Sequence, residues 1–180
     1  MSGARRIPAG VAAVWGLMLL TAAGPVAAQS RLEYSVKANY LVRFAAFVEW
    51  PPRAFQTPQS PVVICVAGRD PFGPALDAAA RAQTAHGRPL AVRRRADATA
   101  LAGCHIVYVG QGGGAALAAA AGQPGLLLVT DSATAPDRGA VHFVLSQGRV
   151  RFHIDQQSAL RNGLQFSSRL LNLALTVRGG

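Results

Sequence analysis

The glycine-rich segment at residues 110–115, GQGGGA, is the part of this sequence whose spacing points most directly to chemistry. It fits the pattern G-x-G-x-x-A, and Asp131 lies 21 residues after Gly110, close to the arrangement of dinucleotide-binding segments. The backbone amides of Gly112, Gly113 and Gly114 could instead bind a small phosphate or carboxylate. The segment follows a middle strand and opens a short alanine-rich helix, which favours a third interpretation, a flexible glycine turn.

Histidines offer the second possible chemistry. His142 and His153 fall on two segments that we expect to pair as a hairpin, so their rings could face each other, and Asp155 lies on the same side of its strand as His153. Such a group could transfer protons, but a pair on the surface of a strand is the commoner arrangement. The sequence has no G-x-S-x-G segment, and its two cysteines do not match a zinc site. We therefore expect no enzymatic activity, no cofactor and no bound metal.

The two cysteines lie in apolar segments that read as buried strands. Cys65 is inside PVVICVAG and Cys104 opens CHIVYVG. If these strands are neighbours, the two sulfur atoms can meet, and the disulfide would stabilise the fold by roughly 4 kcal/mol through loop closure. An even number of cysteines suits an exported protein. The alternative is two buried free thiols.

The first 28 residues have the pattern of a signal peptide. Arg5 and Arg6 precede a stretch without charge at residues 7–23, and Val26 and Ala28 fit a signal peptidase site with cleavage after Ala28. An uncleaved membrane anchor is the alternative, although the apolar stretch is short for a span of about 20 residues. We therefore expect a signal peptide at residues 1–28, a single domain at residues 29–180 and a periplasmic location.

The charge of the protein is strongly positive. Removal of the two arginines of the signal peptide lowers the formal charge from +10 to +8. Export argues against nucleic acid as the partner of this basic chain. An anionic membrane surface, an acidic protein face or an anionic ligand would suit it better, and a solvated basic surface without a partner is the remaining interpretation.

Besides the short alanine-rich helix and a short helical turn at residues 156–163, three longer helices can be predicted from periodicity and from helix-ending residues. The first should end at Trp50, because Pro51 and Pro52 disfavour helical backbone before them. The second should start with Asp70 as its N-cap and Pro71 in its first turn. We expect the third, an amphipathic helix, over residues 164–177. The apolar face of the first helix carries Val36, Tyr40, Leu41, Phe44, Phe47 and Val48.

Strands and helices alternate through the middle of the chain. Apolar strands are predicted at residues 61–68, 104–110 and 124–131, a shorter strand at residues 88–95, and a hairpin around Gln147 and Gly148. This order predicts an α/β fold: a mostly parallel central sheet with helices on both faces and an antiparallel C-terminal hairpin edge.

Several of these segments, taken in order, resemble the YfiR-like proteins. They are KANYLVRFAAFVEWP at residues 37–51, VVICVAGRDPFGPAL at 62–76, GRPLAVRR at 87–94, CHIVYVG at 104–110 and the long C-terminal segment at 139–174. The resemblance implies a periplasmic α/β domain that forms homodimers. It also implies a regulator that binds the periplasmic part of an inner-membrane diguanylate cyclase, holds the cyclase off and is sequestered by an outer-membrane lipoprotein.

The resemblance also bears on individual residues. Cys65 and Cys104 look like one cysteine pair of the family, whereas a second pair near the hairpin is absent from this sequence. The glycine run after the strand of Cys104 is richer than the family pattern, which weakens the case for a shared ligand site there. A periplasmic small-ligand sensor, binding through Gly112, Gly113 and Gly114, is the alternative function.

Three aromatic residues near the end of the first helix are candidate partner contacts. The face with Leu41, Phe44 and Val48 should pack on the sheet. Phe47, Trp50 and Phe55 are harder to bury together beside two prolines, and aromatic residues held by a rigid turn make good interface anchors. The alternative, that all three fill the edge of the core, stays open at this point.

Overall fold

The protein is described by a computed structural model that covers residues 25–95, 101–134 and 139–179, with side chains from residue 28 onward. Most of the expected signal peptide, residues 1–24, lies outside this part of the chain. Of the helices that the structure describes, none is both long enough and apolar enough to span a membrane.

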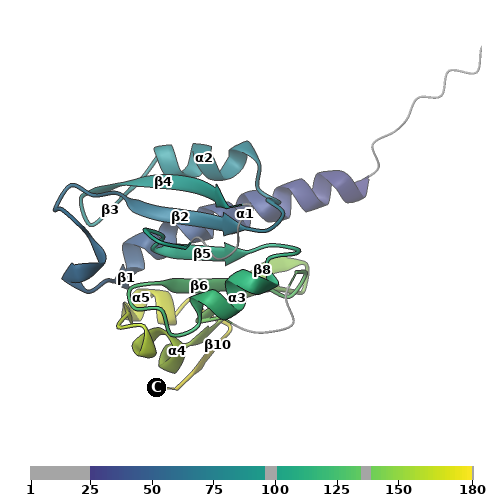
Figure 1. Cartoon of the computed structure of the whole chain (residues 1–180). Helices are drawn as coiled ribbons and strands as arrows, with labels where there is room; N and C mark the ends of the chain where they lie inside the picture. Colours follow the sequence, from purple (N-terminus) through teal and green to yellow (C-terminus); the bar gives the residue numbers. More distant parts are fainter. Residues whose placement is uncertain (1–24, 96–100, 135–138, 180) are drawn as a thin grey trace, which may run out of the picture.

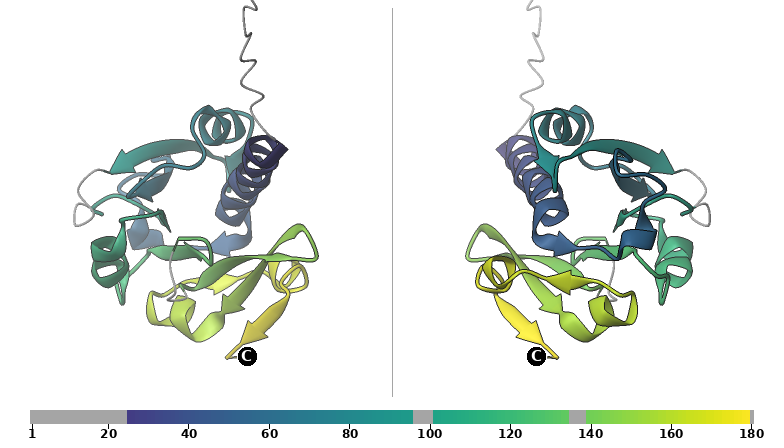
Figure 2. Two further views of the ribbon diagram at one scale, coloured as in Figure 1. Left: turned by 90° about the vertical axis from the view of Figure 1, so that its right-hand side faces the viewer. Right: turned by 90° about the vertical axis from the view of Figure 1, so that its left-hand side faces the viewer.

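Eight strands form one curled sheet in the order β10-β8-β7-β6-β5-β2-β4-β3 (Figures 1 and 2). The five strands from β4 to β7 across its centre are parallel, β8 is antiparallel to β7, and β10 returns parallel to β8. The strands are β2 (Val62–Ala67), β3 (Thr84–Ala85), β4 (Arg88–Arg95), β5 (Ile106–Val109), β6 (Leu127–Asp131), β7 (Val141–Ser146), β8 (Arg149–Asp155) and β10 (Thr176–Arg178). A separate pair joins β1 (Val48–Glu49) to β9 (Gln165–Phe166).

The long helix α1 (Pro25–Phe47) lies inside the curl of the sheet, and its N-terminal part extends past the sheet (Figures 1 and 2). The helix α2 (Pro74–Arg81) packs beside it, whereas α3 (Gly114–Ala120) packs on the opposite face. Two short helices, α4 (Gln156–Arg161) and α5 (Ser168–Leu171), follow the hairpin. A short 3-10 helix, η1 (Pro52–Ala54), follows β1.

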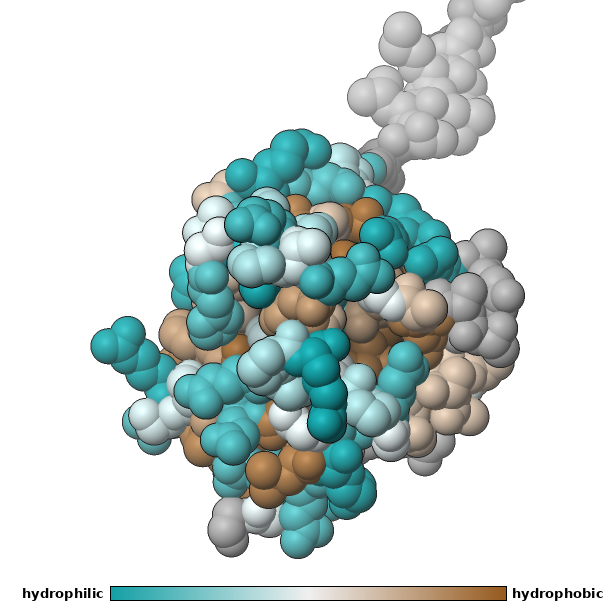
Figure 3. Space-filling view, turned by 60° about the vertical axis from the view of Figure 1, so that its left-hand side comes forward, coloured by the Kyte–Doolittle hydropathy of each residue, from teal (hydrophilic) through white to brown (hydrophobic). Residues whose placement is uncertain are grey.

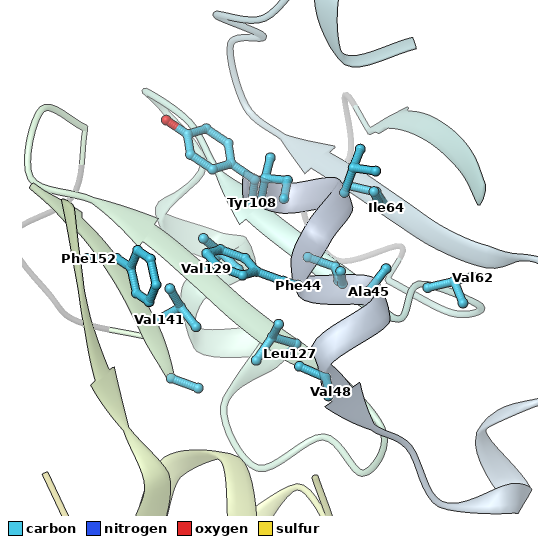
Figure 4. Packing of buried hydrophobic residues seen from close by; sticks show 14 of the residues in the cluster. Phe44, Ala45, Val48, Val62, Ile64, Tyr108, Leu127, Val129, Val141 and Phe152 are labelled. Atoms are coloured by element: carbon cyan, nitrogen blue, oxygen red, sulfur yellow. The ribbon is translucent and has the colours of Figure 1, made fainter. Parts of the chain in front are cut away.

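The core is divided by the sheet because alternate residues of a strand point to opposite faces. In β2, Val62, Ile64 and Val66 join the larger cluster around α1, and Cys65 joins the smaller cluster under α3. Leu41, Phe44 and Val48 are fully buried on the sheet, as predicted. Val48, however, lies in β1 just past the end of α1, and Val36 of the predicted face is 37% exposed. Figure 4 shows part of this larger cluster, with Phe44 and Ala45 of α1 and Val48 of β1 beside Tyr108, Leu127, Val129, Val141 and Phe152.

The sequence-based fold class is correct in its main points. The protein has a mixed α/β fold with a mostly parallel sheet, and the predicted hairpin joins β7 to β8 through Gln147 and Gly148, both of which have positive φ. The hairpin is not the edge of the sheet, however. Residues of β10 pair with β8 and cover it, with Val177 opposite Ile154.

The predicted disulfide is present. Cys65 in β2 and Cys104, just before the neighbouring strand β5, are bonded with their Cα atoms 5.8 Å apart. The bond joins residues 39 positions apart, so it closes a long loop. Parallel pairing of β2 with β5 supplies the proximity that the sequence analysis required.

Two predicted helix boundaries are wrong by about one turn. The helix α1 ends at Phe47, three residues early, because Val48 and Glu49 leave the helix to pair with β9. The helix α2 begins at Pro74 and not at Pro71. Asp70 is no helix cap, since its carboxylate accepts the N–H of Phe72 and pairs with Arg94, and Gly73 occupies the N-cap position.

The C-terminal helix predicted over residues 164–177 is also wrong. This segment forms β9, one turn of helix in α5 and the edge strand β10. Its turn of helix is capped by Ser167, and the chain then leaves the helix so that the N–H of Leu175 donates to the carbonyl of Phe152. The apolar residues of this segment are spaced as in one helix. They belong instead to three short elements, and each element packs against a different part of the protein.

Candidate functional site

A buried ion pair lies between α1 and the end of β6. Lys37 donates through Nζ to the Oδ2 atom of Asp131 at 2.6 Å, and both side chains are inaccessible to solvent. Tyr108 donates its hydroxyl to the same carboxylate oxygen at 3.0 Å, and Glu33 is the second ion-pair partner of Lys37. Buried charges are stable only when paired and hydrogen-bonded, so these four residues act as one unit.

The electrostatics of this unit do not favour proton transfer. Burial lowers the pKa of Lys37, but the hydrogen bonds and negative charges of Asp131 and Glu33 outweigh it, so the net pKa lies above the ordinary value. Burial and the charge of Asp131 raise the pKa of Tyr108, which therefore stays a hydrogen-bond donor. A lysine held protonated and a phenol held neutral are poor acids, bases or nucleophiles at neutral pH.

Sequence reasoning did not single out this unit. Asp131 was noted only for its spacing from the glycine-rich segment, but it is fully buried and hydrogen-bonded to Lys37 and Tyr108. One signal was available: Lys37 lies four and seven residues before Leu41 and Phe44, so it falls on the helix face that packs on the sheet. A lysine in such a position needs a buried carboxylate, and Asp131 ends an apolar strand.

An open groove of about 580 Å³ lies next to the ion pair. Its three walls are one face of α1, the tip of the β7–β8 hairpin and the residues that follow α5. Glu33 belongs to both features, because it lines the groove and pairs with Lys37. The side chains and backbone that line the groove belong to Gln29, Leu32, Glu33, Val36, Tyr40, Leu145, Gly148, Arg149, Val150, Arg151, Asn172 and Leu173.

The glycine-rich segment is packed against the end of β2. A Cβ atom on Gly110 would lie 2.2 Å from the carbonyl oxygen of Arg69, and one on Gly113 would lie 2.7 Å from that of Ala67. Gly112 has a φ of +81°, and Gly114 has open space around it. Close approach of two backbones and one left-handed turn therefore account for Gly110, Gly112 and Gly113, and so for two of the three proposed ligand contacts.

The aromatic residues Phe47, Trp50 and Phe55 are all partly buried and pack against the larger core cluster. The ring of Phe55 stacks on His105 at 4.5 Å and is contacted by the guanidinium group of Arg88 at 3.8 Å. Figure 3 turns the side with the connection between β1 and β2 toward the viewer. Apolar surface there lies in separate areas between hydrophilic side chains, not in one continuous patch.

The predicted histidine pair faces across the hairpin. His142 and His153 are register partners with ring centroids 6.5 Å apart, and each Nδ1 atom meets a threonine hydroxyl. Asp155 is used elsewhere, because its carboxylate accepts the N–H of Ser158 and caps α4. The two histidines thus pack across the hairpin, and Asp155 caps a helix. These structural roles explain the spacing of the three residues without an acid–base function.

The curled sheet, the buried ion pair and the open groove define a small disulfide-bonded α/β domain with a surface suited to binding. Comparison with protein families shows to which family this domain belongs. Residues 34–175 match the model of the YfiR/HmsC-like family, and the chain belongs to that family. No curated protein gave a match.

Proposed function

We propose that this protein is an exported regulator, not an enzyme, which binds the periplasmic part of an inner-membrane diguanylate cyclase and holds that cyclase inactive. The observation that carries the proposal is membership of the YfiR/HmsC-like family over residues 34–175. The Cys65–Cys104 disulfide supports a periplasmic location, because disulfides persist in oxidising compartments. The cleaved signal peptide at residues 1–28 belongs to the same proposal.

Repression by binding requires only that the protein favour one state of its target. A preference of about 3 kcal/mol shifts a balanced two-state switch more than a hundredfold. Homodimer formation and release by an outer-membrane lipoprotein complete the proposed cycle. The aromatic residues Phe47, Trp50 and Phe55 remain a proposed contact surface, although their partial burial also gives them a role in the core.

The test is the cellular level of cyclic di-GMP after deletion of the gene. Complementation uses either the full chain or a chain that lacks residues 2–28. We expect the level to rise on deletion and to fall again only with the full chain, because only that form is exported. An unchanged level after deletion, or rescue by the form without residues 2–28, contradicts the proposal.

A second function, a periplasmic small-ligand sensor, is favoured by one observation. The groove volume of about 580 Å³ falls within the range of small-molecule sites, roughly 300–1,000 Å³. In this alternative, Gly112, Gly113 and Gly114 would contribute a separate anion contact, for which Gly114 has the open space. A small molecule retained by the purified protein, and identified by mass spectrometry after denaturation, would favour it.

A further inference from the structure

The groove beside the ion pair exposes an unusual set of apolar side chains. Leu32, Val36, Leu145 and Leu173 all line it and are between 37% and 68% exposed. Leu32 and Val36 are one helical turn apart on α1, so they present one continuous strip to the groove. Burial of a leucine side chain contributes about 1.5–3 kcal/mol. Large apolar side chains gathered in an open concave surface therefore mark a binding site.

The polar part of the groove is positively charged. Arg149 and Arg151 line it from β8, and neither forms a salt bridge with any residue in the described part of the chain. Among the described residues of the groove, Glu33 is the one carboxylate. It shares the single cation Lys37 with Asp131, so these three residues keep a charge of −1, which the two arginines outweigh. A ligand of this groove would thus meet exposed leucines together with two unpaired guanidinium groups.

This charge distinguishes between the possible occupants. A second copy of the chain would bring a molecule of formal charge +10, or +8 after the expected cleavage, against these same arginines. A flat bilayer surface does not fill a groove with three walls. A protein segment with acidic residues flanking apolar ones satisfies both the leucines and the arginines.

We propose that this groove is the main surface that binds the target protein, with Phe47, Trp50 and Phe55 as additional contacts outside it, and that its occupant is an acidic segment with apolar anchor side chains. The inference rests on the proposed function and names the surface through which that function acts. Leu32, Val36, Leu145 and Leu173 take the apolar anchors, and Arg149 and Arg151 pair with the flanking carboxylates.

The first test is complementation of the deletion strain with the charge-reversed pair Arg149→Glu and Arg151→Glu. We expect cyclic di-GMP to stay at the level of the deletion strain, since repulsion replaces attraction at the groove. The matched control is Arg43→Glu with Arg161→Glu, which changes the net charge equally at exposed positions outside the groove. The control should restore the wild-type level. Equal behaviour of the two pairs overturns the proposal.

Loss of folding must be separated from loss of binding. The variant with Leu145→Ser and Leu173→Ser removes two exposed side chains, so its melting temperature should stay near that of the wild type. We expect this variant to be exported at a normal level and to fail in repression. Normal repression by this well-folded variant also overturns the proposal.

The occupant is identified by a photocrosslinking amino acid, p-benzoylphenylalanine, placed at Leu173 of the full chain in cells. The control position is Leu160, which is 55% exposed and lies outside the groove. We expect an adduct to a membrane protein, within a segment rich in Asp and Glu, that disappears in the Arg149→Glu and Arg151→Glu variant. An adduct to a second copy of this chain, to lipid, or equally from Leu160 overturns the proposal.

Failure of the proposed function gives a different pattern. If deletion leaves cyclic di-GMP unchanged while Leu173 still forms the charge-dependent adduct with an acidic segment, the groove stands and the cyclase is not its target. If deletion raises cyclic di-GMP while every groove variant represses normally, the function stands and the groove is not its surface.

Discussion

Lys37 and Asp131 are 94 positions apart in the chain, yet their Nζ and Oδ2 atoms lie 2.6 Å apart in the interior of the protein. The pair joins the helix inside the curl of the sheet to the end of a central strand. Lys37 also pairs with Glu33, and Glu33 lines the groove. The contact therefore sets the position of the groove wall as well as the packing of α1.

We expect Lys37→Met to lower the free energy of unfolding by about 3–5 kcal/mol, because it leaves the Asp131 carboxylate buried without its cation. Urea denaturation measures the change. Arg43→Met, at an exposed position of the same helix, is the control and should change stability by less than about 0.5 kcal/mol. The double variant with Asp131→Asn should lose less than the sum of the two single losses. Strict additivity would contradict a coupled pair.

Removal of the disulfide should destabilise the protein without changing its fold. The double variant Cys65→Ala and Cys104→Ala loses the closure of a long loop, for which we expect a loss of about 4 kcal/mol. Denaturation with and without a reductant measures it. The wild type should lose stability on reduction, whereas the double variant should not respond. A wild type that is equally stable in both conditions would argue against the bond in solution.

His105 should make the protein sensitive to mild acid. The N–H of Val63 donates to its Nδ1 atom, so the neutral ring carries its hydrogen on Nε2, which donates to the carbonyl of Ala54. Burial, with the positive charges of Arg88 and Arg93, lowers the pKa of His105. The unfolded chain then takes up the proton first. Stability is complete above the ordinary pKa of about 6.5 and falls as the pH drops toward the lowered pKa, by at most about 1.4 kcal/mol per pH unit.

Denaturation at pH 7.5 and at pH 5 measures this effect of His105. His105→Asn keeps an acceptor near the N–H of Val63 and removes the titration. The wild type should therefore lose more stability between the two pH values than the variant does. The other histidines titrate in both proteins, so only the difference counts. Equal losses would show that His105 does not carry the effect.

Two neighbouring glycines should respond oppositely to alanine. Gly113→Ala brings a Cβ atom to within 2.7 Å of the carbonyl of Ala67, for which we expect a loss of about 1–3 kcal/mol. Gly114→Ala meets nothing within 4 Å and should be neutral or stabilise by up to about 1 kcal/mol. Thermal unfolding measures both. If the segment binds a ligand, Gly114→Ala should weaken binding while stability is kept, and unchanged binding would leave packing as the reason for the glycines.

Trp50 allows its role in the core and its role as a partner contact to be separated. Its Nε1–H is buried and has no hydrogen-bond partner in the described part of the protein. Trp50→Phe removes this desolvated donor and keeps an aromatic ring, so we expect a change in unfolding free energy within about 1 kcal/mol. Trp50→Ala should lose about 2–3 kcal/mol of packing.

Repression by the two Trp50 variants is measured beside their melting temperatures. A stable Trp50→Phe protein that no longer represses would support partner contact through the aromatic residues. Normal repression by Trp50→Phe, together with an unstable Trp50→Ala protein, would assign Trp50 to the core alone.

Local sequence patterns predicted correctly those elements whose residues all lie in the same surroundings, such as a strand that is buried along its whole length. The apolar segments around Cys65 and Cys104 are strands covered on both faces, and the turn at Gln147 and Gly148 joins the hairpin as expected. The segment at residues 164–177 has apolar residues at helical spacing, but it serves three elements in succession. A periodic pattern cannot show that each short piece packs against a different neighbour.

The sequence by itself determined the α/β class and the family, because these depend on local order along the chain, whereas the Cys65–Cys104 bond also needed β2 and β5 to be neighbours. The tertiary structure decided which distant groups meet. Only it brought Lys37 to Asp131, closed Gly113 against β2, and placed Leu32, Leu145 and Leu173 around one groove. The physical reason is that burial and charge pairing act across space, whereas propensity and periodicity act along the chain.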